Sequence, residues 1–261
     1  MKSPLTEGLK PEERLILPAD FKPTEGGVEG IRRKVLALAD AVEGTGVVIK
    51  VNSALRACGY SLIKELHDRG VMVMADLKLV DITETMETDA QIIAEYDPEL
   101  LTVMCCAGID GMRRVQEALG TTEVLGVTVL TSLNEEDCDA IFTCSTKAGV
   151  LRFSRMAQLA GLGGLVLSGA ELEVVSNRKE LLLSLNTPAI RPAWSVVEGD
   201  DQAKSRVMTP AKAIIGGADR IVVGRPILGA KPNDKGLPQN PREAVERTIA
   251  EIAEGLAARQ N

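Results

Sequence analysis

The stretch VMVMADLKLVDITET at residues 71–85 places an apolar, β-branched run directly before three closely spaced charges. Alternate side chains of a strand point to opposite faces, and here both faces are apolar as far as Asp76 and Lys78. A strand that is apolar on both faces is typical of a buried parallel sheet. Burying two charges at its end is costly unless they pair, so a structural ion pair is one interpretation. The third charge, Asp81, and the rest of the chain favour a functional cluster.

Seven further apolar segments alternate with stretches of helical periodicity. With the opening stretch as the third strand, we expect the other strands at residues 14–19, 46–51, 100–106, 123–130, 164–167, 187–190 and 220–223. We expect helices at residues 31–42, 53–70, 84–96, 111–119, 147–160 and 242–257, and an acidic loop or short helix at 134–144. Eight strands alternating with helices in 261 residues predict an α/β fold, a single-domain (β/α)8 TIM barrel. A doubly wound open sheet is the alternative.

The chain shows no linker, repeat or low-complexity segment that would divide it further. We expect a polar N-terminal leader at residues 1–13 and the barrel domain at residues 14–261. The leader lacks the apolar core of a signal peptide, and no run of about 18 apolar residues follows it. Five cysteines without a C-x-x-C pair suggest reduced thiols. The sequence therefore predicts a cytoplasmic protein without a membrane partner.

Composition and missing motifs exclude several classes of function. A net charge of −7 and an aromatic content of 2% argue against nucleic acid as a partner. No zinc pattern, P-loop, G-x-G-x-x-G or G-x-S-x-G motif is present. The single histidine, His67, is expected on a helix surface, which disfavours a Ser-His-Asp triad.

Polar side chains gather where the expected strands end. In a barrel, the carboxyl ends of the strands form the active site, so these side chains are the candidate functional residues. They are Asp20, Lys50, Asp76, Lys78, Thr131, Ser132, Arg191 and Arg225.

The segment after the eighth strand, VGRPI at residues 223–227, predicts a phosphate site. Gly224 allows a close approach of the backbone, and a proline fits the first turn of a helix. Barrels commonly bind phosphate here, and Arg225 would add a bidentate contact. The loop from Arg191 to Thr209 carries Gln202 and is long enough to close as a lid. The alternative is that Gly224 and Arg225 only turn the chain.

The charges Lys50, Asp76, Lys78 and Asp81 alternate in sign, so each would stabilise the ionised form of its neighbours. Lys78 would then stay protonated and could act as a proton donor. This suits a reaction in which a substrate carboxylate leaves as CO2 and the resulting carbanion takes a proton. A Schiff-base aldolase is a rival, but it needs a neutral, desolvated amine.

These residues resemble the orotidine 5′-phosphate decarboxylase family. Its signature D-x-K-x-x-D-I-x-x-T matches residues 76–85, with Thr83 in place of the usual proline. Its first-strand aspartate and second-strand lysine match Asp20 and Lys50. Further matches, in the family's order, are the T-x-L-T-S segment at 128–132, the P-[GA]-I-R segment at 188–191 and the V-V-G-R-[PS]-I segment at 222–227.

The resemblance implies cofactor-independent decarboxylation of orotidine 5′-phosphate to UMP in pyrimidine biosynthesis, with no metal. Asp76 would oppose the substrate carboxylate, and Lys78 would protonate C6. The resemblance also implies a homodimer whose site is shared, with the partner chain supplying Asp81, Ile82 and Thr85. The substrate-binding roles fall to Asp20 and Lys50 for the ribose, Thr131 and Ser132 for the pyrimidine, and Arg191, Gln202, Gly224 and Arg225 for the phosphate.

Two rival functions remain. Sister barrels with a similar signature are magnesium-dependent sugar-phosphate decarboxylases and aldolases, which use a histidine in the active site. The single histidine of this chain, His67, is expected on a helix surface and does not match it. A non-catalytic nucleotide-binding barrel is the other, and it would be expected to lose Lys78 or Asp76. One departure from the family is a longer segment between Gln202 and the Thr-Pro pair that follows it.

Overall fold

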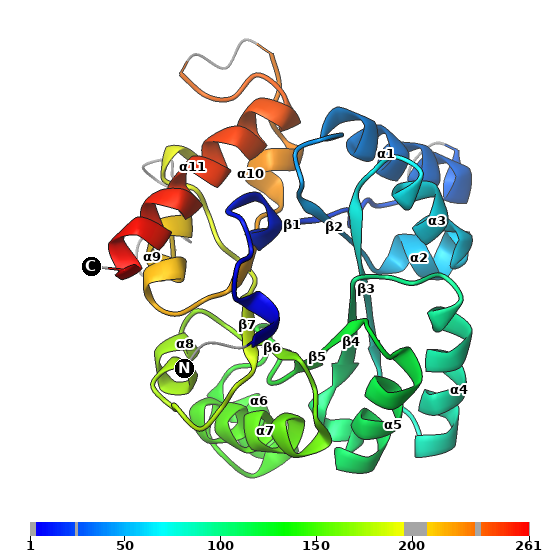
Figure 1. Ribbon diagram of the computed structural model, residues 1–261, viewed down its shortest axis with the longest axis vertical. Coiled ribbons are helices and arrows are strands. Elements are labelled where there is room, and N and C mark those ends of the chain that lie inside the picture. Colours follow the sequence, from blue (N-terminus) through cyan, green and yellow to red (C-terminus); the bar gives the residue numbers. More distant parts are fainter. Residues whose placement is uncertain (1–3, 24–25, 196–207, 233–235, 261) are drawn as a thin grey trace. The chain divides into compact units, whose positions relative to one another are not determined.

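The computed structural model describes residues 4–23, 26–195, 208–232 and 236–260. Its sheet closes in the order β1-β2-β3-β4-β5-β6-β7-β8, which confirms the (β/α)8 barrel and excludes the open sheet. The strands, labelled in Figure 1, are β1 (Leu15–Pro18), β2 (Val48–Val51), β3 (Met72–Leu79), β4 (Leu100–Met104), β5 (Glu123–Val127), β6 (Gly164–Val166), β7 (Ser184–Thr187) and β8 (Arg220–Val222).

Helices follow each strand. They are α1 (Gly27–Ala41), α2 (Ser53–Cys58), α3 (Ser61–His67), α4 (Thr83–Ala94), α5 (Ile109–Leu119), α6 (Glu135–Phe142), α7 (Thr146–Ala160), α8 (Leu172–Ser176), α9 (Pro210–Ile215), α10 (Arg225–Leu228) and α11 (Pro241–Gln260). Four 3-10 turns complete the set: η1 (Pro4–Thr6), η2 (Glu12–Arg14), η3 (Cys105–Ala107) and η4 (Ala193–Ser195). In the part of the chain that the structure describes, no helix is long and apolar enough to cross a membrane.

The chain packs as two compact units. Among the described residues, the first unit comprises residues 4–8, 76–188 and 216–219. The second comprises residues 9–23, 26–75, 189–195, 208–215, 220–232 and 236–260. Each unit has its own set of parallel strands and covering helices.

In the second unit, β1 lies between β2 and β8. Ile16 is in register with Val48 of β2 and Val222 of β8, and Val51 of β2 is in register with Ala75 of β3. Leu15, Ile16 and Leu17 of β1 are fully buried, which makes this strand part of the core. On the outside, α9 and α11 pack side by side (Figure 1). Gly255 permits this contact, because a Cβ there would lie 2.9 Å from the backbone of Ala211.

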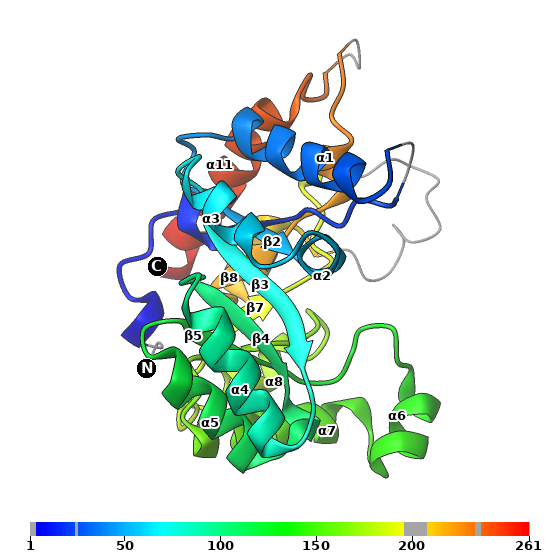
Figure 2. The same ribbon diagram turned by 90° about the vertical axis from the view of Figure 1, so that its right-hand side faces the viewer.

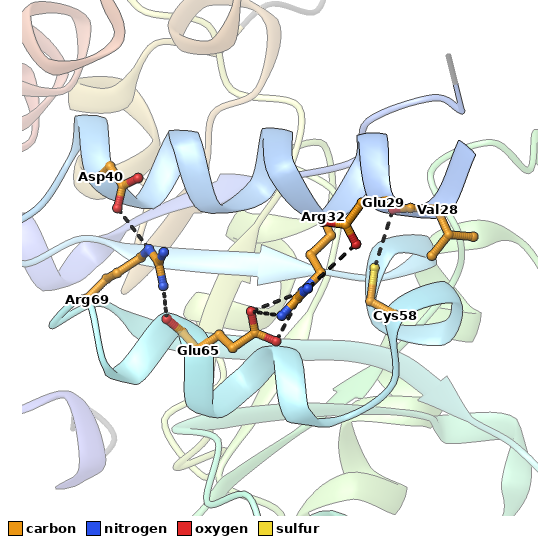
Figure 3. A network of polar contacts seen from close by, with 7 residues as sticks. All are labelled: Val28, Glu29, Arg32, Asp40, Cys58, Glu65 and Arg69. Atoms are coloured by element: carbon orange, nitrogen blue, oxygen red, sulfur yellow. Dashed lines mark hydrogen bonds and ion pairs between the residues drawn. The ribbon is translucent and has the colours of Figure 1, made fainter. Parts of the chain in front are cut away.

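Ion pairs join α1 to the α3 segment of the same unit (Figure 3). Arg32 of α1 donates to Glu65 of α3 from Nε at 3.1 Å and from Nη2 at 2.6 Å. Arg69 donates to Asp40 at 2.8 Å. The hydrogen bonds that the Arg32 guanidinium donates to Glu65 raise the pKa of this guanidinium. These partly exposed pairs align two amphipathic helices whose apolar faces are buried.

In the first unit, β4, β5, β6 and β7 are paired in parallel, with Leu125 of β5 in register with Thr102 of β4 and Gly164 of β6. Two helices, α4 and α5, lie side by side over this part of the sheet (Figures 1 and 2). Gly111 of α5 allows their close approach, since a Cβ there would come within 2.9 Å of the Met86 sulfur.

Several local predictions were wrong, and one of them is the fifth strand, which ends at Val127 rather than at residue 130. The seventh strand spans Ser184–Thr187 rather than residues 187–190, and its polar side chains are fully buried. Two of them are satisfied inside the sheet: Asn186 donates to the Leu165 carbonyl at 3.0 Å, and Ser184 donates to Glu123. The buried Thr187 hydroxyl has no hydrogen-bond partner among the described residues. A polar strand of this kind has no apolar signal to reveal it.

The helix expected at residues 53–70 is divided into α2 and α3. Gly59 separates them with φ at 83°, a left-handed conformation that stops a helix. The strand expected to reach Cys106 ends earlier, at Met104, and continues as η3. Cys105 is buried, but Cys106 is exposed rather than part of the core.

The close packing of β6 generates a stability prediction. A Cβ at Gly164 would overlap the Ser184 hydroxyl and come within 2.7 Å of a Leu125 methyl group. We expect Gly164→Ala to lower the free energy of unfolding by about 2 kcal/mol, as overpacking does. Denaturant titration measures this loss. Adding Ser184→Ala should recover part of the lost stability, because the overlapping oxygen is gone. If the double variant instead loses the sum of the two single losses in unfolding free energy, the account is contradicted.

Candidate active site

In the second unit, the structure brings Asp20 and Lys50 together. Pro18 at the end of β1 is in register with Lys50 of β2, and the Ala19 N–H donates to the Lys50 carbonyl at 2.8 Å. Asp20 follows Ala19 and therefore lies next to Lys50. The Lys50 Nζ atom is 2.9 Å from Asp20 Oδ2. The lysine side chain is 11% exposed, whereas the carboxylate is 50% exposed. At such a pair, the carboxylate can accept hydrogen bonds from a polyhydroxy ligand and the ammonium can donate hydrogen bonds to it.

In the first unit, Asp76 and Lys78 form a tight ion pair at the end of β3. The two residues are two positions apart, so their side chains leave the strand on one face. Lys78 Nζ lies 2.7 Å from each carboxylate oxygen of Asp76. The Asp76 side chain is only 6% exposed, and that of Lys78 is 31% exposed. The carboxylate is therefore an anion held out of water, while the ammonium retains an accessible side.

Thr102 of β4 completes this cluster. Its hydroxyl donates to Asp76 Oδ1 at 2.9 Å and accepts a hydrogen bond from the Lys78 backbone N–H, also at 2.9 Å. The residue is fully buried. Sequence analysis did not identify Thr102, and its only signal is a hydroxyl within the apolar strand LLTVM.

The backbone at Lys78 is in the left-handed region, with φ at 51°. This conformation costs a non-glycine residue roughly 1–2 kcal/mol, and it persists only where the surroundings hold it. Such residues cluster at functional sites, so the position of this one at the Asp76 pair supports a functional role for the cluster.

After β3, the chain exposes Asp81 and Ile82 before α4 begins. Asp81 Oδ1 accepts a hydrogen bond from the Ile82 N–H at 2.7 Å. Ile82 is 66% exposed and Val80 is 56% exposed, so this short segment presents two aliphatic side chains at the surface of the chain. Thr85 follows in the first turn of α4 and is half-buried.

The two residues expected to contact a pyrimidine lie in a turn after β5. The Leu133 N–H donates to the Leu130 carbonyl at 3.0 Å, which places Thr131 and Ser132 at the centre of the turn. Both are exposed. The preceding Thr128 is buried and anchors the segment, since its hydroxyl donates to the Val166 carbonyl at 3.0 Å.

The segment after β7 returns to β8 before it leaves the barrel. The Ile190 N–H donates to the Val222 carbonyl at 3.4 Å, and the Arg191 N–H donates to the Met208 carbonyl at 3.1 Å. Ala189 is left-handed, with φ at 62°, which agrees with the glycine or alanine that the P-[GA]-I-R pattern has at this position. Arg191 is half-buried. Gln202, together with residues 196–207 as a whole, lies outside the described residues.

The candidate phosphate segment begins directly after β8. Gly224 precedes α10, and Pro226 occupies the first turn of that helix, as expected. A Cβ at Gly224 would come within 3.1 Å of the Pro18 ring, so the chain passes close to the end of β1. Arg225 is exposed and available to an anion. Within the described ranges, no group of three His, Cys, Asp or Glu side chains is arranged to hold a metal ion.

Comparison with known proteins assigns the family. The model of the orotidine 5′-phosphate decarboxylase / HUMPS family matches residues 13–237. The chain belongs to this family. The chain is 35% identical over 257 residues to a protein of Syntrophus aciditrophicus named orotidine 5′-phosphate decarboxylase, covering 95% of this chain and 96% of that protein. A protein of the same name from Bradyrhizobium sp. is 36% identical over 251 residues, covering 95% of each.

Solved structures of the family have the same fold. The crystal structure of orotidine 5′-phosphate decarboxylase from Lactobacillus acidophilus superimposes with a TM-score of 0.74 at 25% identity, covering 92% of this chain and 99% of that one. The enzyme of that name from Pyrococcus horikoshii OT3 gives a TM-score of 0.70 at 24% identity, covering 92% and 99%. At this identity the second comparison shows the fold alone.

Proposed function

We propose that this chain is an orotidine 5′-phosphate decarboxylase, which converts orotidine 5′-phosphate to UMP in pyrimidine biosynthesis without a metal or cofactor. The observation that carries the proposal is the Asp76–Lys78 pair: a buried carboxylate and a partly exposed ammonium within the family signature. Family membership supports the same reaction, and so do the names of the curated relatives. We further propose a cytoplasmic enzyme whose residues 1–13 form a leader to the barrel domain of residues 14–261.

In the proposed reaction, the bond between C6 and the carboxylate carbon breaks and its electron pair remains on C6. Lys78 Nζ gives a proton to C6, and CO2 leaves. Asp76 faces the substrate carboxylate as a fixed anion, so the loss of that negative charge as CO2 is favoured. The ammonium beside it stabilises the charge that develops on C6. The 2.7 Å contacts of Lys78 with both oxygens of Asp76 support these two roles.

The remaining candidate residues would hold the nucleotide. We assign the ribose hydroxyls to Asp20 and Lys50, because the pair offers an exposed acceptor and a buried donor. Thr131 and Ser132 offer exposed hydroxyls to the pyrimidine. Arg191, Gln202, Gly224 and Arg225 are assigned to the phosphate. Since no cofactor accepts the electrons, binding energy from the remote phosphate would be used to position the reacting ring.

We propose a homodimer with a shared active site, in which Asp81, Ile82 and Thr85 serve the partner's substrate. The exposed aliphatic pair Val80 and Ile82 supports this arrangement, because a contact with a second subunit would bury it. Asp81 lies between the two, so the same contact would carry its carboxylate into the neighbouring site.

The test of the reaction is the fall in orotidine 5′-phosphate absorbance on addition of purified protein, with and without EDTA. We expect rapid loss that the chelator does not affect. Loss that EDTA abolishes would favour a magnesium-dependent reaction of the kind used by the sister sugar-phosphate enzymes. UMP binding without any turnover would favour the non-catalytic nucleotide-binding barrel.

Removal of the proton donor should abolish turnover but not binding. For Lys78→Ala we expect kcat to fall about 1,000-fold or more, in line with the loss of a general acid, while UMP still binds. Steady-state kinetics and calorimetric titration of UMP measure the two effects. The matched control is Lys212→Ala, which removes an exposed lysine of α9. Turnover of Lys78→Ala at the wild-type rate would remove Lys78 as the donor.

Removal of the phosphate contact should act mainly on KM. A charge-assisted hydrogen bond contributes about 1.5–3 kcal/mol, so we expect Arg225→Ala to raise KM by about 10- to 100-fold. The matched control is Arg113→Ala, which removes a partly exposed arginine paired with Asp110 on α5. Unchanged kinetics of Arg225→Ala, with inhibition by UMP intact, would assign the phosphate to other residues.

The shared site predicts complementation between inactive subunits. We expect Lys78→Ala and Asp81→Ala to be inactive alone and to regain activity when mixed, because a mixed dimer contains one site with both residues intact. Activity after mixing, with subunit exchange followed by native mass spectrometry, measures this. No recovery despite confirmed exchange would show that Asp81 acts in the site of its own chain.

A further inference from the structure

One hydroxyl group connects the two residues assigned to the chemistry. Thr102 Oγ1 donates its proton to Asp76 Oδ1 at 2.9 Å and accepts the Lys78 N–H at 2.9 Å. Asp76 is in turn paired with Lys78 Nζ at 2.7 Å. The hydroxyl, the carboxylate, and both the backbone and side chain of Lys78 thus form a closed ring of contacts.

The hydrogen bond to the backbone accounts for the unusual conformation of Lys78. A left-handed residue inside a strand turns its N–H away from the regular ladder and leaves it in need of another acceptor. Thr102 supplies that acceptor from the neighbouring strand β4. Because Thr102 is fully buried, water cannot replace its hydroxyl there without a rearrangement.

The hydrogen bond to the carboxylate fixes the orientation of Asp76. Lys78 Nζ contacts both carboxylate oxygens from the end of a long, flexible side chain. Thr102 adds a donor on a β-branched side chain with few rotamers, and it contacts Oδ1 alone. The same buried oxygen atom thus contacts both the carboxylate of Asp76 and the backbone of Lys78.

We propose that Thr102 is a positioning residue for the decarboxylation: it does not touch the substrate but sets the orientation of Asp76 and the backbone of Lys78. The inference rests on the proposed function, in which those two side chains act on the substrate. A carboxylate and an ammonium aimed at one reacting carbon need accurate placement, and a misplacement of about 1 Å can cost about 100-fold in rate.

The test compares two changes at Thr102 with a matched change elsewhere in the same unit. Thr102→Val keeps the shape but removes the hydroxyl, and Thr102→Ser keeps the hydroxyl. Thr122→Val is the control, since Thr122 is also buried and its hydroxyl donates to the Pro98 carbonyl at 2.8 Å, before β4 and β5 begin. The measurements are kcat, the affinity for UMP and the melting temperature of each variant.

For Thr102→Val we expect kcat to fall by about 10- to 100-fold with the affinity for UMP within about threefold of wild type. Thr102→Ser should recover most of kcat, and Thr122→Val should keep the wild-type kcat even if it melts earlier. A wild-type kcat in Thr102→Val would overturn the proposal. A parallel loss of kcat and UMP affinity in Thr102→Val that Thr102→Ser does not restore would also overturn the proposal. That result is expected of a residue with a structural role alone.

A second measurement separates this inference from the proposed function. Hydrogen exchange of the Lys78 amide, followed by NMR, does not depend on turnover. We expect it to be slow in the wild type and at least about tenfold faster in Thr102→Val, with the other amides of β3 unchanged. If the wild type does not decarboxylate orotidine 5′-phosphate, the proposed function fails. If the Lys78 amide of Thr102→Val exchanges as slowly as in the wild type, the Thr102 inference fails, whatever the turnover assay shows.

Discussion

The pairing of a buried carboxylate with a lysine at the end of one strand is the constraint on which the rest of this structure depends. Asp76 lies out of water, and an isolated ion in that position would cost several kcal/mol. Lys78 and Thr102 offset this cost with hydrogen bonds to both carboxylate oxygens. The pair is held in place at the expense of backbone strain at Lys78. Such strain is stable only inside a scaffold that determines the surrounding strands firmly.

The scaffold does this with short strands whose side chains are buried on both faces. In the first unit, Thr102 of β4 lies beside Lys78 at the end of β3. The pairing registers of β4 through β7 fix the position of Thr102 along its strand. In the second unit, the register of β1 with β2 sets Asp20 beside Lys50, and the chain after β8 passes close to Pro18. Strand pairing therefore determines the positions of the charged candidate residues within each unit. Thr131, Ser132 and Arg225 come from the segments that follow the strands.

Sequence patterns predicted the fold class because most strands are apolar runs between helical periodicities. They failed at β7, where Ser184, Asn186 and Thr187 are polar yet fully buried, and at Gly59, which divides a helix that the apolar spacing had joined. The spacing of Asp76 and Lys78 placed both on one strand face, and the structure confirms their contact. Thr102 could not be predicted, because a threonine in a strand signals β propensity and nothing about its partner across the sheet. The left-handed backbone of Lys78 likewise has no signature in sequence.

The most direct test of the account is a crystal structure of the protein with UMP bound. The account predicts that C6 of the uracil lies about 3 Å from Lys78 Nζ, with Asp76 beside it where the substrate carboxylate would be, and that the phosphate contacts Gly224 and Arg225. A nucleotide bound with C6 remote from Lys78, or with its phosphate away from Arg225, would contradict the central claim.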